Sequence, residues 1–287
     1  MNSEPNYLIV TADDFGLAEE VNEAVEIAHR RGVLSAASLM VTGAAAEDAV
    51  RRARRLPNLR VGLHLALLEE NPVMPPSRIP GLVDRSGRMR RDLVRLAFDL
   101  ARSERLRAQM RDEIEAQFKA YVGTGLRLDH VNVHKHYHLH PMIGRDVIAM
   151  ARRFGARAIR VPLEPLGVIQ RVENRSTTAA SQAFACCARW LRSQVRYAGL
   201  LAPDAVFGLA WSGEFTAERL FGLLRHLPPG LIEIYMHPAT ENQFAGSTPG
   251  YRYSDELKAL CATEVLAEIR RLRFARIGYS DLAGEAA

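Results

Sequence analysis

Histidines are concentrated in one short stretch of this sequence. The run from residue 129 to residue 141 reads DHVNVHKHYHLHP and holds five of the nine histidines of the chain. Alternate residues of an extended chain point to the same side, so the spacing predicts one shared face for His134, His136, His138 and His140, with a bend before the proline. A single histidine is more often structural than a ligand, but four at period two favour a metal site, because imidazole binds zinc and related divalent cations. Not all four can bind one ion.

Two adjacent carboxylates, Asp13 and Asp14, follow an apolar strand expected from Tyr7 to Thr11. Neighbouring side chains of a regular strand point to opposite sides, so both cannot lie flat against the same ion. A division of labour follows, in which one carboxylate binds the metal and the other takes a proton from a metal-bound water molecule. The alternative interpretation is that the pair only caps the helix after it.

Further candidates stand at the ends of other apolar runs. Catalytic zinc has three protein ligands, so the expected set is one or two histidines of the run, His64 and one carboxylate of the first strand. His237 follows an apolar strand and is a candidate general acid for a leaving amine, although in isolation such a histidine is as often structural. Arg160 could hold a carboxylate, either that of the substrate or that of Glu164 or Asp13.

The elements that must position these residues are short apolar runs that alternate with amphipathic segments, a pattern typical of parallel α/β folds. Seven or eight strands in series predict one α/β domain over residues 1–287, a closed or nearly closed (β/α) barrel with its site at the carboxyl ends of the strands. The strand candidates are Tyr7–Thr11, Ala36–Val41, Arg60–Leu65, Leu126–His134, Ala158–Val161, Ala205–Gly208, Leu231–His237 and Phe274–Tyr279.

Three other segments have a distinct character. Helical periodicity dominates from residue 92 to residue 122, and the proline-rich segment 71–80 is expected to be a loop. Residues 176–201 contain Trp190 and Tyr197, and we favour an ordinary barrel helix over an amphipathic surface element there. The three cysteines, two of them adjacent at Cys186 and Cys187, form neither a disulfide framework nor a zinc motif and are expected to be buried.

The formal net charge of +5 favours an anionic partner only modestly. The arginine-rich segments are best explained as solvated helix faces, with a basic surface against anionic lipid headgroups as the alternative. No signal peptide or membrane-spanning run is evident, so we expect a cytoplasmic protein. Nucleic acid is not expected as a partner, and peripheral contact with the inner membrane and a homodimer are left open.

Together these motifs resemble the YdjC-like (ChbG-type) carbohydrate deacetylases. The resemblance rests on Ala12–Gly16, Val61–Leu65, the histidine run, Arg160–Glu164 and Met236–Pro238, which occur in order along the chain. It implies a deformed TIM-like barrel and one divalent metal ion, Zn²⁺ or Mg²⁺.

The resemblance also assigns roles to individual residues. Asp14, His64 and His134 would bind the metal, Asp13 would act as general base and His237 as general acid. Members of the family commonly have an aspartate where this chain has Asn132. That difference leaves open which of His134, His136 and His138 is the ligand.

The variant His-Lys-His-Tyr-His-Leu-His-Pro resembles the branch of this family associated with hopanoid biosynthesis, the HpnK type. This implies an N-acetylglucosaminyl hopanoid as the substrate, and therefore a glycolipid partner. The alternatives are a deacetylase of chito-oligosaccharides, another metal-dependent amidase or phosphoesterase on the same site, and a non-catalytic glycolipid carrier. The second carboxylate of the Asp13-Asp14 pair argues against the carrier, because a structural metal site does not need it.

Overall fold

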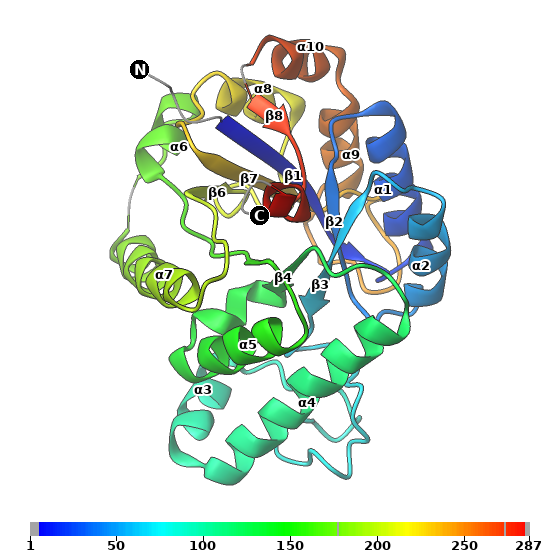
Figure 1. Ribbon diagram of the computed structural model, residues 1–287, viewed down its shortest axis with the longest axis vertical. Coiled ribbons are helices and arrows are strands. Elements are labelled where there is room, and N and C mark those ends of the chain that lie inside the picture. Colours follow the sequence, from blue (N-terminus) through cyan, green and yellow to red (C-terminus); the bar gives the residue numbers. More distant parts are fainter. Residues whose placement is uncertain (1–5, 177, 273, 285–287) are drawn as a thin grey trace.

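A computed structural model describes residues 6–176, 178–272 and 274–284 of the chain. Eight strands lie at the centre and helices surround them (Figure 1). The strands are β1 (Asn6–Phe15), β2 (Ala36–Leu39), β3 (Arg60–Leu65), β4 (His130–Val133), β5 (Ala158–Ile159), β6 (Ala205–Phe207), β7 (Leu231–Met236) and β8 (Phe274–Arg276). Each lies where the apolar runs predicted one.

The helices fill the intervals between the strands. They are α1 (Glu19–Arg31), α2 (Ala46–Arg54), α3 (Leu93–Arg102), α4 (Glu104–Gly123), α5 (Pro141–Arg153), α6 (Leu166–Val172), α7 (Ala179–Tyr197), α8 (Ala217–Leu224), α9 (Tyr253–Cys261) and α10 (Thr263–Arg271). Two 3₁₀ segments, η1 (His134–Leu139) and η2 (Tyr279–Gly284), complete the described elements. The helical segment expected at 92–122 is divided by Ser103, whose side chain caps the start of α4.

The sheet is parallel throughout and runs in the order β5-β4-β3-β2-β1-β7-β6, with β8 paired to the first residues of β1. Backbone hydrogen bonds also link its two edges, from Ile159 N to Leu201 O and from Val206 N to Leu163 O, each at 3.0 Å. These bonds curl the sheet into a nearly closed barrel. The predicted α/β fold, a deformed TIM-like barrel, is therefore confirmed.

Burial explains why these segments form their elements. Strand β1 is buried from Leu8 to Phe15, as expected for a central parallel strand covered on both faces. Helix α1 turns the apolar stripe Val21, Ala24, Val25 and Ala28 inward. It ends before Gly32, where an added Cβ would lie only 2.4 Å from the carbonyl oxygen of Leu260.

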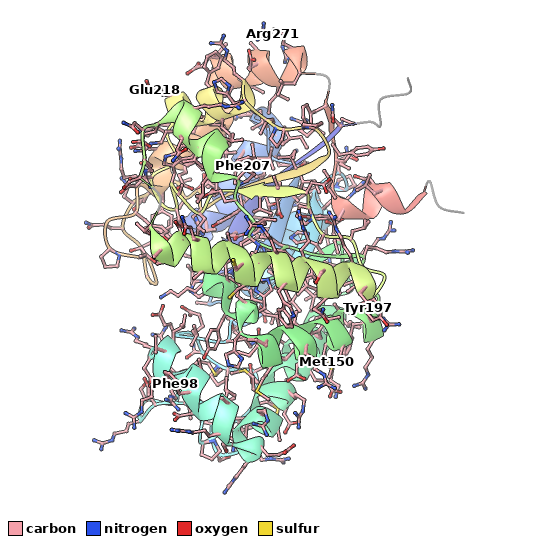
Figure 2. The ribbon with its side chains drawn as sticks, turned by 90° about the vertical axis from the view of Figure 1, so that its left-hand side faces the viewer. Phe98, Met150, Tyr197, Phe207, Glu218 and Arg271 are labelled. Atoms are coloured by element: carbon pink, nitrogen blue, oxygen red, sulfur yellow. The ribbon has the colours of Figure 1, made fainter. Side chains whose placement is uncertain are left out.

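Helix α7 differs from the ordinary barrel helix that the sequence favours. Only Ala188, Leu191 and Val195 of its 19 residues are buried, so it packs by a narrow stripe and leaves most of its surface exposed (Figure 2). The expectation of buried cysteines is wrong for Cys186 and Cys187, which lie on this exposed surface. Among the described residues, no helix is both long enough and apolar enough to cross a bilayer.

Candidate active site

A β-bulge brings the two adjacent aspartates to one pocket. The pairing of β1 with β2 shifts register between Ala12 and Phe15, and Asp14 has a left-handed backbone with φ of 61°. A bulge re-aims the side chain that it contains. Asp13 and Asp14 consequently line the same pocket, although a regular strand would point them to opposite sides.

Asp14 lies in a cluster with two histidines that come from other strand ends. Its Oδ1 is 3.2 Å from Nε2 of His64 on β3 and 3.6 Å from Nδ1 of His134, the residue after β4. The two ring nitrogens are 3.4 Å apart. One donor atom from each residue lies within 4.8 Å of the others, a spacing that could hold a metal ion.

The protonation of the cluster fits a cation. Nδ1 of His64 lies 2.7 Å from the amide oxygen of Asn132. An amide oxygen only accepts, so in the neutral ring Nδ1 carries the proton and the lone pair of Nε2 faces the cluster. Asp14 Oδ1 is buried without a hydrogen-bond partner among the described residues. Two imidazoles and one carboxylate form a ligand set that suits zinc and related divalent ions.

Electrostatics also favour a cation here. Asp13, Asp14 and Glu233 are buried carboxylates, and Arg160 is the buried guanidinium between two of them. Burial disfavours the Asp14 carboxylate, but when the rings of His134 and His64 donate hydrogen bonds to it they outweigh burial and hold the pKa of Asp14 well below its usual range. When both rings are neutral, as metal ligation requires, three carboxylates against one guanidinium leave an excess of buried negative charge, which a bound cation would neutralise.

The histidine run does not form the extended face that its period predicts. Residues His134–Leu139 form η1, and the left-handed backbones of Lys135 and His136, with φ of 53° and 54°, turn the chain. The prediction of one shared face for the four histidines is therefore wrong, because side chains separated by these turns point in different directions. The structure places His134 with Asp14 and His64, whereas His136 lines the same pocket outside this cluster and His138 lies behind the pocket wall.

The other two histidines of η1 make separate contacts. Nε2 of His136 is 2.9 Å from the hydroxyl of Tyr235, and this ring lines the pocket. His138 is fully buried and its Nε2 donates to the carbonyl oxygen of Arg160 at 2.8 Å. Burial lowers the pKa of His138 to about 4 and holds that of His136 well below its ordinary value. Both rings are neutral near pH 7.

Asp13 is an ionised carboxylate held by three donors. Its Oδ1 accepts from Ser38 Oγ at 2.8 Å and from Asn132 Nδ2 at 3.1 Å, and its Oδ2 accepts from Arg160 Nη1 at 2.5 Å. Burial works against the charged form, but Arg160 and His64 outweigh it and hold the pKa of Asp13 well below its usual range. Its orientation is fixed while it faces the pocket.

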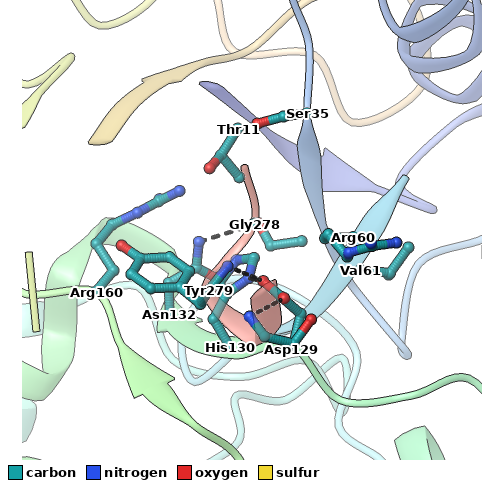
Figure 3. A network of polar contacts seen from close by, with 12 residues as sticks. Thr11, Ser35, Arg60, Val61, Asp129, His130, Asn132, Arg160, Gly278 and Tyr279 are labelled. Carbon is teal, nitrogen blue, oxygen red and sulfur yellow. Dashed lines mark hydrogen bonds and ion pairs between the residues drawn. The ribbon is translucent and has the colours of Figure 1, made fainter. Parts of the chain in front are cut away.

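Arg160 joins Asp13 to a second carboxylate that the sequence did not single out. Its Nη2 donates to Glu233 Oε1 at 2.7 Å, and its guanidinium lies 4.6 Å from the centre of the Tyr235 ring. Tyr279 extends this buried network toward the Asp129–His130 pair (Figure 3). The sequence suggested a substrate carboxylate, Glu164 or Asp13 as the partner of Arg160, and the structure shows the contact with Asp13.

Glu164 has a different role from the one expected as a partner of Arg160. Its carboxylate accepts the backbone N–H groups of Gly208, Leu209 and Ala210 at 3.0 to 3.1 Å. Burial raises the pKa of Glu164 to about 7. Glu164 therefore supports the loop after β6, which contributes Leu209 to the pocket wall.

His237 follows β7 and faces the same pocket as Asp13. Its ring lies 5.7 Å from that of Tyr235 and 5.5 Å from that of Tyr251, and its backbone N–H donates to the buried carboxylate of Glu256. Nδ1 of His237 is buried and has no hydrogen-bond partner within the described part of the chain. The ring is held by packing and retains an unused nitrogen.

The pocket has a volume of about 310 Å³. It contains Asp13, Asp14, His64, His134, His136 and His237, whereas Arg160, Glu164 and His138 lie behind its wall. Sequence reasoning missed several residues of its lining, namely Phe184, Ser212, Tyr235, Thr248 and Tyr251. Tyr235 had a signal, because it stands two residues before His237 and alternate residues of a strand share a face.

A nearly closed (β/α) barrel that gathers these groups at the carboxyl ends of its strands has the architecture of a barrel enzyme. The chain belongs to the family described as YdjC-like protein, whose profile matches residues 7–271.

Its relatives are similar over nearly their whole length. A carbohydrate deacetylase of Brevibacillus brevis is 29% identical over 278 residues, which cover 96% of this chain and 99% of the relative. A carbohydrate deacetylase of Vibrio vulnificus is 27% identical, with 96% of each chain covered. A crystal structure of an Enterococcus faecalis protein assigned to cellobiose-phosphate cleavage superimposes with a TM-score of 0.77 at 22% identity, covering 97% of this chain and 99% of that one. This last similarity supports the fold.

Proposed function

We propose that the protein is a metal-dependent hydrolase that removes the acetyl group from an N-acetylglucosamine-containing substrate. The observation that carries this proposal is the Asp14–His64–His134 cluster in one pocket with the ionised Asp13 and with His237. The curated relatives named carbohydrate deacetylase, which align over nearly the full chain, support the reaction class.

Asp14, His64 and His134 would hold the metal ion. When bound there, a divalent cation supplies Lewis-acid polarisation of the acetamide carbonyl and lowers the pKa of water from near 16 toward ~7. The two imidazoles favour Zn²⁺, and Mg²⁺ is the alternative when availability decides occupancy. Asn132 keeps the Nε2 lone pair of His64 turned toward the site.

Asp13 would accept the proton of the attacking water molecule. Its carboxylate is ionised, faces the pocket and is held by Arg160, Ser38 and Asn132, so no reorientation is required before proton transfer. Asp13 itself has no place in the cluster of metal ligands. The bulge of β1, which turns both aspartates to one pocket, supports this proposed division of labour.

His237 would donate a proton to the amine that leaves. It faces the same pocket, and the two tyrosine rings and Glu256 hold it in place. The reaction then balances: water adds to the acetyl carbon, the C–N bond breaks, Asp13 takes a proton, His237 supplies one, and acetate and a free amine result.

We propose an N-acetylglucosaminyl hopanoid as the substrate, on the basis of the HpnK-type histidine run. Helix α7 supports a lipid-borne substrate. It supplies Phe184 to the pocket and leaves Trp190 and Tyr197 exposed at 42% and 92%, and it contains three arginines and no acidic residue. Aromatic and arginine side chains on one helix suit peripheral contact with anionic lipid. For a cytoplasmic protein, which we also propose, such a substrate would imply peripheral contact with the cytoplasmic face of the membrane.

Acetate release separates this proposal from its rivals. Purified protein reconstituted with Zn²⁺ or Mg²⁺ is given an N-acetylglucosaminyl hopanoid, chito-oligosaccharides and sugar phosphates, and both acetate and phosphate are measured. We expect acetate from the hopanoid at the highest kcat/KM. Acetate from chito-oligosaccharides alone would move the substrate to free sugars, phosphate would favour the phosphoesterase, and glycolipid binding without any product would favour the carrier.

A further inference from the structure

Glu233 is a buried carboxylate beneath the pocket that the proposed reaction does not use. It lies on β7 and has no exposed surface. Its Oε1 accepts from Thr11 Oγ1 and from Arg160 Nη2, each at 2.7 Å, and its Oε2 accepts from the hydroxyl of Tyr279 at 2.6 Å. Both carboxylate oxygens are thus bound.

Arg160 is held at both ends of its guanidinium. One terminal nitrogen donates to Asp13 and the other to Glu233, while the ring of Tyr235 lies against the group. Two anchors fix the rotation of a planar guanidinium, whereas a single anchor leaves it free to swing about the remaining bond. The direction from which Arg160 approaches Asp13 therefore depends on Glu233.

The contact with Tyr279 extends the chain of bonds to the last described element. The backbone N–H of Tyr279 and that of Ser280 donate to the carboxylate of Asp129 at 3.2 and 2.7 Å, and Asp129 also contacts His130 (Figure 3). The segment η2 is thereby fastened beneath the barrel, with the tyrosine hydroxyl reaching up to Glu233.

Stability alone does not account for this arrangement. Desolvation of each buried ion costs several kcal/mol, and replacing a buried ion pair by apolar side chains is often neutral or stabilising. What an arginine shared between two carboxylates supplies is a single fixed geometry.

We infer that Glu233 is a positioning residue for Asp13, acting through Arg160, and that Tyr279 holds Glu233 in place. Only the kinetic part of this inference rests on the proposed deacetylation. The fixed orientation of Arg160 is a separate claim about the folded protein.

Kinetics test the effect on the reaction. Glu233→Gln keeps the shape of the side chain but removes its charge, so we expect kcat to fall by roughly 10- to 100-fold, as for small displacements of a reacting group, with KM changed less than about twofold. Tyr279→Phe should also lower kcat, by a smaller factor. If Tyr279 acts through Glu233, the double variant should be no slower than Glu233→Gln alone.

Two buried residues elsewhere provide matched controls. Glu113 accepts from the backbone N–H groups of Val73 and Met74, and the hydroxyl of Tyr121 lies within hydrogen-bond distance of the carbonyl oxygens of Val61 and Arg127. Glu113→Gln and Tyr121→Phe should lower stability without lowering kcat. The affinity for Zn²⁺, measured by calorimetry, should stay within about twofold of wild type in all four single variants.

Nuclear magnetic resonance of ¹⁵N-arginine-labelled protein tests the positioning without any substrate. Arg160 signals, assigned by their loss in Arg160→Lys, should show separate Nη protons in wild type, because rotation is blocked, and faster averaging of these protons in Glu233→Gln, whose neutral amide is a weaker acceptor for the guanidinium. If Glu233→Gln does not fold, Tyr279→Phe should give partial averaging. Unchanged Nη signals in these variants would overturn the inference. Inactive wild type with blocked rotation would instead count against deacetylation alone.

Discussion

At the scale of single residues, the site depends on small differences between similar groups. Asp13 and Asp14 are neighbours in sequence, yet one is held by Arg160 and the other lies with two histidines. Asn132 connects the surroundings of the two aspartates. Its oxygen accepts from His64, which lies beside Asp14, and its nitrogen donates to Asp13. A carboxylate at this position could not donate to Asp13, so the amide is matched to its surroundings here.

Asn132→Ala should weaken metal binding because it removes the acceptor that fixes the His64 tautomer. Loss of such a support typically costs about 10- to 100-fold in metal affinity. Calorimetric titration with Zn²⁺ measures this, with Gln109→Ala as a control because Gln109 accepts from Gly81 away from the cluster. Equal affinities for Asn132→Ala and wild type would show that the amide does not orient His64.

The sequence predicted the candidate residues better than their contacts. Asp13, Asp14, His64 and His237 could be selected because each stands at the end of an apolar run, and the barrel brings such ends together. Glu233 was missed although it shares the inward face of β7 with Tyr235 and His237 at period two. A lone acidic residue within an apolar strand gives no sign of its partner when that partner, Arg160, is distant in sequence.

At the scale of elements, η1 shows how two backbone angles override a side-chain pattern. Four histidines at period two predict a strand face, but Lys135 and His136 adopt left-handed conformations. Nothing in residue types alone signals this, since left-handed backbone is uncommon for residues other than glycine. The turn places His134 with Asp14 and His64 in the candidate metal site and directs His138 into the core.

The neutral state of His138 predicts a loss of stability in acid. Its pKa is about 4 in the folded protein and 6.5 ordinarily, so between these values the unfolded chain binds a proton that the folded chain does not. The contribution of the neutral His138 to stability is complete above pH 6.5 and is lost as the pH drops toward 4. The shift corresponds to roughly 3 kcal/mol at about 1.36 kcal/mol per pKa unit.

Urea denaturation of the metal-free protein at pH 7 and at pH 4.5 measures this loss. His138→Gln can still donate to the Arg160 carbonyl but cannot take up the proton, so its free energy of unfolding should fall less than that of wild type. His226→Gln alters an exposed histidine and should behave as wild type. An equal decline in wild type and His138→Gln would contradict the account.

At the scale of the whole molecule, polar contacts cross the barrel interior from η2 to the pocket. The chain of bonds runs from Asp129 through Tyr279, Glu233 and Arg160 to Asp13. The eight strands and their order along the chain could be predicted because apolar runs specify buried parallel strands. The way the sheet edges approach each other could not be predicted, because it depends on single backbone hydrogen bonds at the end of β5 and just beyond it.

Removal of residues 279–287 should destabilise the protein without dividing its unfolding into steps. The deletion leaves Glu233 Oε2 without its donor, which should lower the free energy of unfolding by about 1–3 kcal/mol. It also removes a buried aromatic ring, which should lower it by about 3–5 kcal/mol. Denaturation followed by tryptophan fluorescence and by circular dichroism should give coincident transitions at lower urea than wild type. Tyr279→Phe separates the hydroxyl from the ring, and an unchanged midpoint for the deletion would refute the role of η2.

The most direct test of the central claim is acetate release from an N-acetylglucosaminyl substrate by metal-loaded wild type, Asp13→Asn and His64→Ala, with bound metal measured in each. Wild type should release acetate and lose this activity with a chelator. Asp13→Asn should retain the metal and turn over roughly 10²- to 10⁴-fold more slowly, and His64→Ala should lose the metal. Full activity of Asp13→Asn, or undiminished activity of metal-free wild type, would contradict the account.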